Sequence, residues 1–204
     1  WEDEDDQDGI RPESVTINLL GDGEKVETIV LSEDNKWTHT WTELPKKAKG
    51  VDIEYTVEEV TTAVITGTDQ VGEYAIEISG DAEKGYTVTN THTPELISIP
   101  VEKVWDDNDN QDGFRPDSVS VYLESDDEEI MKGIVLNEGN EWKSEFADLP
   151  KYRDHGTEIK YDVYEEVVDE YETTIEGDQE KGFTVTNTHE PELTKVPVSK
   201  VWDD

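Results

Sequence analysis

The sequence predicts an all-β protein made of two tandem immunoglobulin-like β-sandwiches with about seven strands each. Three observations support this fold class. A long pattern occurs twice along the chain. Short runs that alternate apolar and polar residues are separated by turn residues. No stretch shows convincing helical periodicity. About seven short strands in roughly 100 residues are typical of such a sandwich.

The internal repeat predicts the domain organisation. Two segments match without a gap: Trp1-Glu-Asp-Glu-Asp-Asp-Gln-Asp-Gly-Ile-Arg-Pro12 and Trp105-Asp-Asp-Asn-Asp-Asn-Gln-Asp-Gly-Phe-Arg-Pro116. Trp202-Asp-Asp204 begins the pattern a third time. We therefore expect domain 1 at residues 1–95 and domain 2 at residues 96–192. Residues 193–204 would be the first strand of a third domain, or a donor strand for a neighbouring chain. Both chain ends fall in mid-pattern, so we expect an excerpt from a longer polypeptide.

Alternation predicts the strands in order along each repeat. In the first repeat they are Ser14–Leu20, Glu27–Leu31, Lys36–Trp41, Glu54–Val60 and Gly85–His92. In the second repeat they are Ile99–Trp105, Val119–Leu123, Gly133–Leu136, Glu141–Phe146, Lys160–Val167 and Gly182–His189. The copy of the Ile99 strand at Val196–Trp202 is expected to be a strand as well.

Composition excludes several partners and chemistries. The chain has 53 acidic and 17 basic residues among 204, a net charge of −36, so nucleic acid and anionic membranes would repel it. It has no cysteine, which excludes disulfides and thiolate metal sites. No apolar run approaches the length of a membrane span, and no signal peptide is recognisable. Six Trp and eight Tyr in alternating runs favour a folded protein over a disordered one.

Three strands of the second repeat each place a polar residue on the same face as their apolar residues. These inward polar residues are Lys103, Glu165 and Asn187. The matching positions are Glu59 and Asn90 in the first repeat, and Lys200 in the Val196–Trp202 segment. A buried lysine is costly unless its charge is neutralised or consumed.

Physical chemistry offers an outcome that removes this cost. Burial lowers the pKa of a lysine and raises that of a glutamate, so the pair can become neutral. A neutral amine can attack the asparagine carboxamide while the glutamate polarises it and transfers protons. Loss of ammonia then leaves a Lys–Asn isopeptide bond and no buried charge. The alternative is an unreacted buried salt bridge beside a hydrogen-bonded asparagine.

Four motifs resemble those of a known family. They are Lys103-Val-Trp105, Asp112-Gly-Phe-Arg-Pro116, Tyr161-Asp-Val-Tyr-Glu165 and Thr186-Asn-Thr-His189. In order and parity they are similar to the collagen-adhesin B-type (CnaB) repeats of Gram-positive surface proteins and pilins. The resemblance covers essentially the whole chain in two units and implies spontaneous intramolecular isopeptide bonds.

The resemblance also implies roles for individual residues. Lys103 would be the nucleophile, Asn187 the electrophile and Glu165 the proton shuttle of domain 2. Glu59 and Asn90 match in domain 1, but the lysine position falls two residues before Trp1. Lys200 has no partner on its own chain. It would react within a third domain, or complete domain 1 of the next chain in a head-to-tail polymer.

The acidic segment Asp106–Gly113 is a second candidate site. Oxygen ligands at alternate positions followed by glycine are typical of calcium loops. The candidate ligands are Asp107, Asp109 and Asp112, with Asp3, Asp5 and Asp8 in the first repeat. The competing interpretation is a solvated turn in which Asp112 caps the backbone and pairs with Arg115. The bidentate glutamate that closes an EF-hand is not evident.

These observations predict a structural stalk or fibre segment of a surface or extracellular filament protein of a Gram-positive bacterium. It would be no enzyme beyond a single autocatalytic turnover, and it would require no cofactor. Its partners would be further repeats in cis, and possibly the same protein in trans. The alternative is an adhesin module that recognises a host protein or glycan; the sequence names no such ligand. A hydrolase is disfavoured because the inward polar residues would be consumed within the fold.

Overall fold

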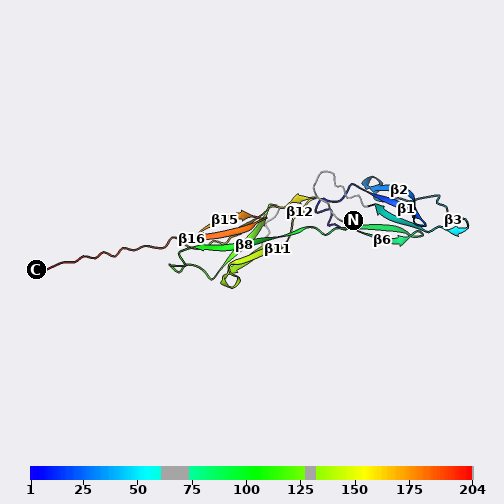
Figure 1. The fold of residues 1–204 in the computed structure, drawn as a ribbon. Helices are drawn as coiled ribbons and strands as arrows, with labels where there is room; N and C mark the ends of the chain where they lie inside the picture. Colours follow the sequence, from blue (N-terminus) through cyan, green and yellow to red (C-terminus); the bar gives the residue numbers. More distant parts are fainter. Residues whose placement is uncertain (61–73, 127–131, 204) are drawn as a thin grey trace. The chain divides into compact units, whose positions relative to one another are not determined.

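The computed structural model describes residues 1–60, 74–126 and 132–203. Strands dominate, and no α-helix occurs in these ranges (Figure 1). The first repeat contains β1 (Ser14–Gly21), β2 (Glu24–Ser32), the 3₁₀ turn η1 (Glu33–Asn35), β3 (Lys47–Ala48), β4 (Val51–Asp52), β5 (Tyr55–Val60), β6 (Ala75–Asp81) and β7 (Gly85–Thr91). The second contains β8 (Leu96–Asp106), β9 (Ser118–Ser125), β10 (Lys132–Asn137), η2 (Glu138–Asn140), β11 (Lys143–Pro150), β12 (Tyr152–Arg153), β13 (Thr157–Glu158), β14 (Tyr161–Glu165), β15 (Glu172–Asp178) and β16 (Gly182–Thr188).

The chain separates into two compact units. Unit 1 comprises Trp1–Glu95 together with Lys151–Glu158, and unit 2 comprises Leu96–Pro150 and Ile159–Asp204. The short β12–β13 hairpin therefore groups with unit 1, although its sequence lies in the second repeat.

Unit 2 is a β-sandwich, as the alternation predicts. One sheet has the strand order β10-β9-β14 and the other β11-β8-β16-β15. β8 and β16 pair in parallel, and the other neighbours are antiparallel. The inward residues of both sheets form one core. Its fully buried members include Ile99, Val101, Val121, Leu136 and Val185.

Unit 1 repeats this plan with fewer paired strands. Its sheet β2-β1-β5 corresponds to β10-β9-β14, and its β6-β7 pair corresponds to β15-β16. Glu2 forms an isolated parallel bridge with Thr91, at the position where Asp106 pairs with Thr188 at the end of the β8–β16 ladder. Trp1 and Glu2 thus correspond to Trp105 and Asp106 at the end of β8.

The predicted strand Lys36–Trp41 is wrong, whereas Val196–Trp202, whose partner would be a third domain or a neighbouring chain, stays a prediction. Lys36–Trp41 is a turn and an extended segment without a ladder. Its counterpart in unit 2, β11, forms backbone hydrogen bonds with β8 only. The described residues of unit 1 contain no strand that could pair with Lys36–Trp41 in this way. Val196–Trp202 is likewise extended but unpaired, and it is drawn without a strand arrow in Figure 1. Conversely, β6 and β15 are strands that the alternation test missed.

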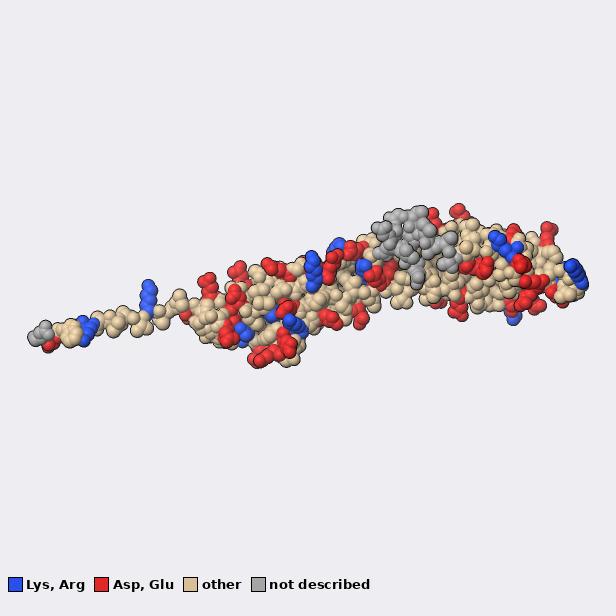
Figure 2. All heavy atoms as spheres, in the orientation of Figure 1, with Lys and Arg blue, Asp and Glu red and all other residues tan. Residues whose placement is uncertain are grey.

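Acidic side chains are spread over the face of both units seen in Figure 2, with lysines and arginines interspersed. This distribution agrees with the net charge of −36. In the described part of the chain, no helix is long and apolar enough to cross a membrane.

Candidate functional site: a buried lysine, glutamate and asparagine

Three strands of unit 2 bring the predicted trio together. Lys103 on β8 and Asn187 on β16 lie in the same sheet, where the parallel register places Lys103 opposite Val185 and Asn187 opposite Trp105. Both residues are buried, at 4% and 0% exposure. Glu165 ends β14 in the facing sheet, so its side chain enters the core from the other side.

The lysine and the glutamate form an ion pair inside the sandwich. Lys103 Nζ lies 3.3 Å from Glu165 Oε1, and both side chains are completely buried. Nζ also donates to the carbonyl oxygen of Val185 at 3.3 Å. Thr173 on β15 donates its hydroxyl to Glu165 Oε2 at 3.0 Å and so orients the carboxylate.

The amine lies in an environment that favours its neutral form. Burial lowers the pKa of Lys103 to about 8, although the nearby Glu165 carboxylate opposes the change. A proton on this amine is therefore lost far more easily than from an exposed lysine. Trp105 covers the group, with its ring centroid 4.4 Å from Nζ.

Asn187 is the unusual member of the trio. Neither its Oδ1 nor its Nδ2 has a hydrogen-bond partner among the described residues, although both atoms are buried. A buried polar group without a partner costs about 1–3 kcal/mol, and native structures contain few of them. The cost disappears if this carboxamide is the group that reacts.

Unit 1 holds the same glutamate and asparagine. Asn90 Nδ2 donates to Glu59 Oε1 at 2.9 Å. Asn90 is 7% exposed. Burial raises the pKa of Glu59, and the hydrogen bond from Asn90 opposes that change. Lys200 lies in the unpaired C-terminal segment, with its Nζ over the ring of Trp202.

The carboxylates of the acidic loops accept hydrogen bonds from other groups of the protein. Asp107 accepts a bidentate pair from Arg115, with Nη2 at 2.6 Å and Nε at 3.0 Å. It also accepts from the Tyr171 hydroxyl at 2.8 Å and from the Asn110 amide at 2.9 Å. The hydrogen bond from Arg115 holds the pKa of Asp107 well below its usual range. The predicted Asp112–Arg115 pair is therefore wrong, because the guanidinium meets the more buried Asp107.

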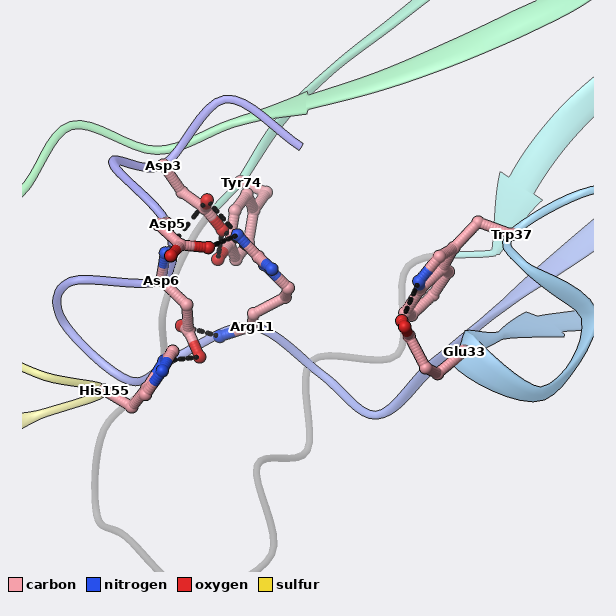
Figure 3. A network of polar contacts seen from close by, with 8 residues as sticks. All are labelled: Asp3, Asp5, Asp6, Arg11, Glu33, Trp37, Tyr74 and His155. Atoms are coloured by element: carbon pink, nitrogen blue, oxygen red, sulfur yellow. Dashed lines mark hydrogen bonds and ion pairs between the residues drawn. The ribbon is translucent and has the colours of Figure 1, made fainter.

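Unit 1 repeats this cluster, as Figure 3 shows. Asp3 accepts from Arg11 Nη2 at 2.6 Å and from the Tyr74 hydroxyl at 2.8 Å. Burial raises the pKa of Asp3, but these bonds outweigh it and lower the pKa to about 2.

Of the remaining calcium candidates, Asp5 lies beside Arg11, the partner of Asp3, with 3.8 Å between its Oδ1 and Nη2 of Arg11. Asp8 and Asp112 face histidines and linker amides, while Asp5 and Asp109 are exposed. Among residues 1–60, 74–126 and 132–203, no group of three or more His, Asp or Glu side chains could hold a metal ion.

Sequence reasoning missed the two tyrosines and Thr173. A signal for the tyrosines was present, since Glu73-Tyr74 and Glu170-Tyr171 recur in both repeats. Thr173 carried no comparable signal, because its role depends on the pairing of β15 with β16 and on the facing β14.

Comparison with known proteins agrees with this architecture. The model of the Cna protein B-type domain matches residues 1–91 and again residues 99–188. A collagen adhesin of Staphylococcus aureus is 45% identical over 205 residues, which cover 100% of this chain and 16% of that protein. The crystal structure of two B repeat units (B1B2) of the S. aureus collagen-binding protein superimposes with a TM-score of 0.76 at 42% identity. It covers 94% of this chain and 48% of that one.

The fold and the inward polar residues define a class of repeated β-sandwich domains found in surface adhesins. The chain belongs to the Cna protein B-type domain family and contains two copies of that domain. It spans about one sixth of the length of the collagen adhesin that it matches.

Proposed function

We propose that this chain is a stalk segment of a cell-surface protein and that unit 2 is locked by an isopeptide bond between Lys103 and Asn187. The observation that supports the bond most directly is the fully buried Asn187 carboxamide without a hydrogen-bond partner in the described chain. It lies on the strand next to the buried Lys103, which is paired with Glu165. The relatives support the surface location, because the matched S. aureus protein is an adhesin.

The reaction balances with the chain's own groups. Glu165 accepts a proton from the Lys103 ammonium, across the 3.3 Å that separates Nζ from Oε1. The free amine attacks Cγ of Asn187, and the resulting tetrahedral centre expels Nδ2. Glu165 delivers its proton to that leaving nitrogen and then passes on the second proton of the amine, so the nitrogen departs as ammonium and the neutral chain is lighter by one ammonia. A Cγ–Nζ amide replaces the Cγ–Nδ2 bond, and Glu165 is ready to accept a proton again. The chain turns over no external substrate.

The bond suits a spacer under tension. It would join the first strand of the sandwich to the last and close a loop of 84 residues (187 − 103). Restricting the unfolded chain in this way stabilises the fold by about 4–5 kcal/mol. Pulling on β8 and β16 would then load a covalent amide instead of separating the hydrogen bonds between them. Collagen binding is a property of the whole adhesin, of which this region is 16%, so we assign the repeats the role of spacer.

Intact mass spectrometry of the 204-residue chain tests the bond. We expect the monomer to lack the mass of one ammonia, and a tryptic digest to contain a branched peptide that joins Lys103 to Asn187. Lys103→Ala and Glu165→Gln should both restore the full mass. The matched control Lys143→Ala removes an exposed lysine of the same sandwich and should keep the deficit. A full-mass wild-type monomer would contradict the proposal.

A further inference from the structure

Thr173 lies at the edge of the buried trio. It belongs to β15, the outer strand of the four-stranded sheet, and pairs directly with Asn187 on β16. Directly paired residues of neighbouring strands project from the same face of a sheet, so Thr173 lies on the inward face with Asn187. Thr173 is an exposed residue, whereas the side chains of Lys103 and Glu165 are completely buried. Its hydroxyl donates to Oε2 of Glu165 at 3.0 Å and so joins the buried carboxylate to the rim of the sandwich.

The two oxygens of the Glu165 carboxylate have different surroundings. Oε1 lies 3.3 Å from Lys103 Nζ and has no other partner among the described residues. Oε2 accepts the hydroxyl of Thr173. The terminal torsion of a glutamate has only broad preferences of its own, so a hydrogen bond at one oxygen fixes where the other oxygen points. In the reaction proposed for unit 2, the carboxylate takes a proton from Nζ and returns it to the nitrogen that leaves, so its orientation matters twice.

Comparison of the two repeats shows that the strand itself does not require this hydroxyl. The residue at the equivalent position of unit 1 is Ile76, which pairs with Asn90 as Thr173 pairs with Asn187. Threonine and isoleucine are both β-branched, and both are favoured in strands. The fold therefore accepts either residue at this position, and the hydroxyl of Thr173 is a feature of the site.

We propose that Thr173 is a positioning residue for the cross-linking reaction of unit 2, holding Oε2 of Glu165 so that Oε1 stays within reach of Lys103 Nζ. This inference rests on the isopeptide bond proposed above. Thr173 acts through Glu165: its hydroxyl keeps its own proton, and none of its covalent bonds forms or breaks. Loss of orientation at a reacting group slows a reaction by roughly 10- to 100-fold.

The time course of bond formation tests this role. Cell-free synthesis with a short pulse of labelled amino acids gives full-length chains of known age, and mass spectrometry after quenching in denaturant measures the loss of ammonia. Thr173→Val keeps the shape of the side chain without the hydroxyl, and it should slow this loss by roughly 10- to 100-fold. Thr173→Ser keeps the hydroxyl and should react at close to the wild-type rate. The matched control Thr174→Val changes the neighbouring exposed residue of opposite parity and should leave the rate unchanged.

Two further measurements separate positioning from a general weakening of unit 2. Resistance to a protease pulse follows folding in the same samples, and it should appear equally fast in the wild-type chain and in Thr173→Val. Asn187→Ala prevents the bond but keeps Lys103, Glu165 and Thr173. In that chain, Thr173→Val should move the NMR signal of the Glu165 carboxyl carbon, and Thr174→Val should not.

The outcomes distinguish this inference from the proposed function. A wild-type chain that never loses ammonia would contradict the bond itself. A wild-type chain that reacts, with Thr173→Val reacting equally fast, would overturn only the role of Thr173. Equal slowing by Thr173→Ser and Thr173→Val would also overturn that role, because packing and not the hydroxyl would then set the rate. Folding that is delayed in Thr173→Val as much as the loss of ammonia would do the same, since the defect would then precede the reaction.

Discussion

At the residue scale, Asp107 shows how a loop that resembles a calcium site serves a structural purpose. Its carboxylate is 1% exposed and satisfied by Arg115, Tyr171 and a backbone amide. Trp105 packs edge-on against the ring of Tyr171, with 5.0 Å between their centroids. The cluster thereby fixes the loop after β8 against the start of β15. The same arrangement of Asp3, Arg11 and Tyr74 recurs in unit 1.

We predict that Asp107→Ala destabilises unit 2 by about 1.5–3 kcal/mol, since charge-assisted hydrogen bonds of a buried group are lost. The pKa of this carboxyl is depressed, so its contribution is complete above the unfolded value of about 4 and is lost as the pH falls through the folded pKa. Chemical denaturation at pH 7 and at pH 3 measures both effects. Asp109→Ala replaces an exposed residue of the same loop and should change the free energy of unfolding little at either pH. Equal losses of stability from the two variants would contradict this role of Asp107.

At the element scale, the last strand of each repeat is followed by a linker that is hydrogen-bonded to the acidic loop. His189 follows β16, and its Nε2 lies 3.1 Å from Asp112 Oδ2. Its Nδ1 lies 2.8 Å from the Glu170 carbonyl oxygen. The Asp112 carboxylate also accepts from the amide of Glu192 at 2.7 Å. Both ring nitrogens therefore face acceptors, an arrangement that only the doubly protonated imidazolium satisfies.

We predict that this linker contact weakens as the pH rises. The hydrogen bond with Asp112 raises the pKa of His189, so its stabilisation is full below the unfolded value of about 6.5 and is lost as the pH passes the folded pKa. NMR titration measures the pKa of His189, and hydrogen exchange of the Glu192 amide, followed over the same pH range, reports the loss of the linker contact. Asp112→Asn should remove the elevation of the pKa, and Asp109→Asn should not. A His189 pKa that is insensitive to Asp112→Asn would exclude the contact.

At the scale of the whole molecule, the two units have the same plan but differ in how well their cores are covered. The residues beneath β8 in unit 2 are 0–5% exposed, and most of their unit 1 counterparts are half-buried. Full burial of one aliphatic side chain contributes about 1.5–3 kcal/mol. Unit 2 would gain further from its cross-link.

We therefore predict two separate transitions in calorimetry of dilute protein, with unit 1 unfolding at the lower temperature. Lys103→Ala should lower the upper transition only. One cooperative transition in the wild-type chain would contradict independent units.

The sequence by itself determined the β-sandwich class, the repeat and the inward faces of the main strands. These follow from local alternation, which every strand expresses without reference to its partners. It also singled out Lys103, Glu165 and Asn187, because a polar residue at a position that alternation assigns to the apolar face can be recognised from the sequence alone. The tertiary structure alone decided which neighbours each strand has. Lys36–Trp41 and Val196–Trp202 have strand patterns and no ladder, since a strand exists only when a second backbone satisfies its amides and carbonyls. The tertiary structure also decided that Arg115 pairs with Asp107 and not with Asp112, and that Thr173 donates to Glu165 of the facing sheet. Both contacts depend on how the strands and loops pack together.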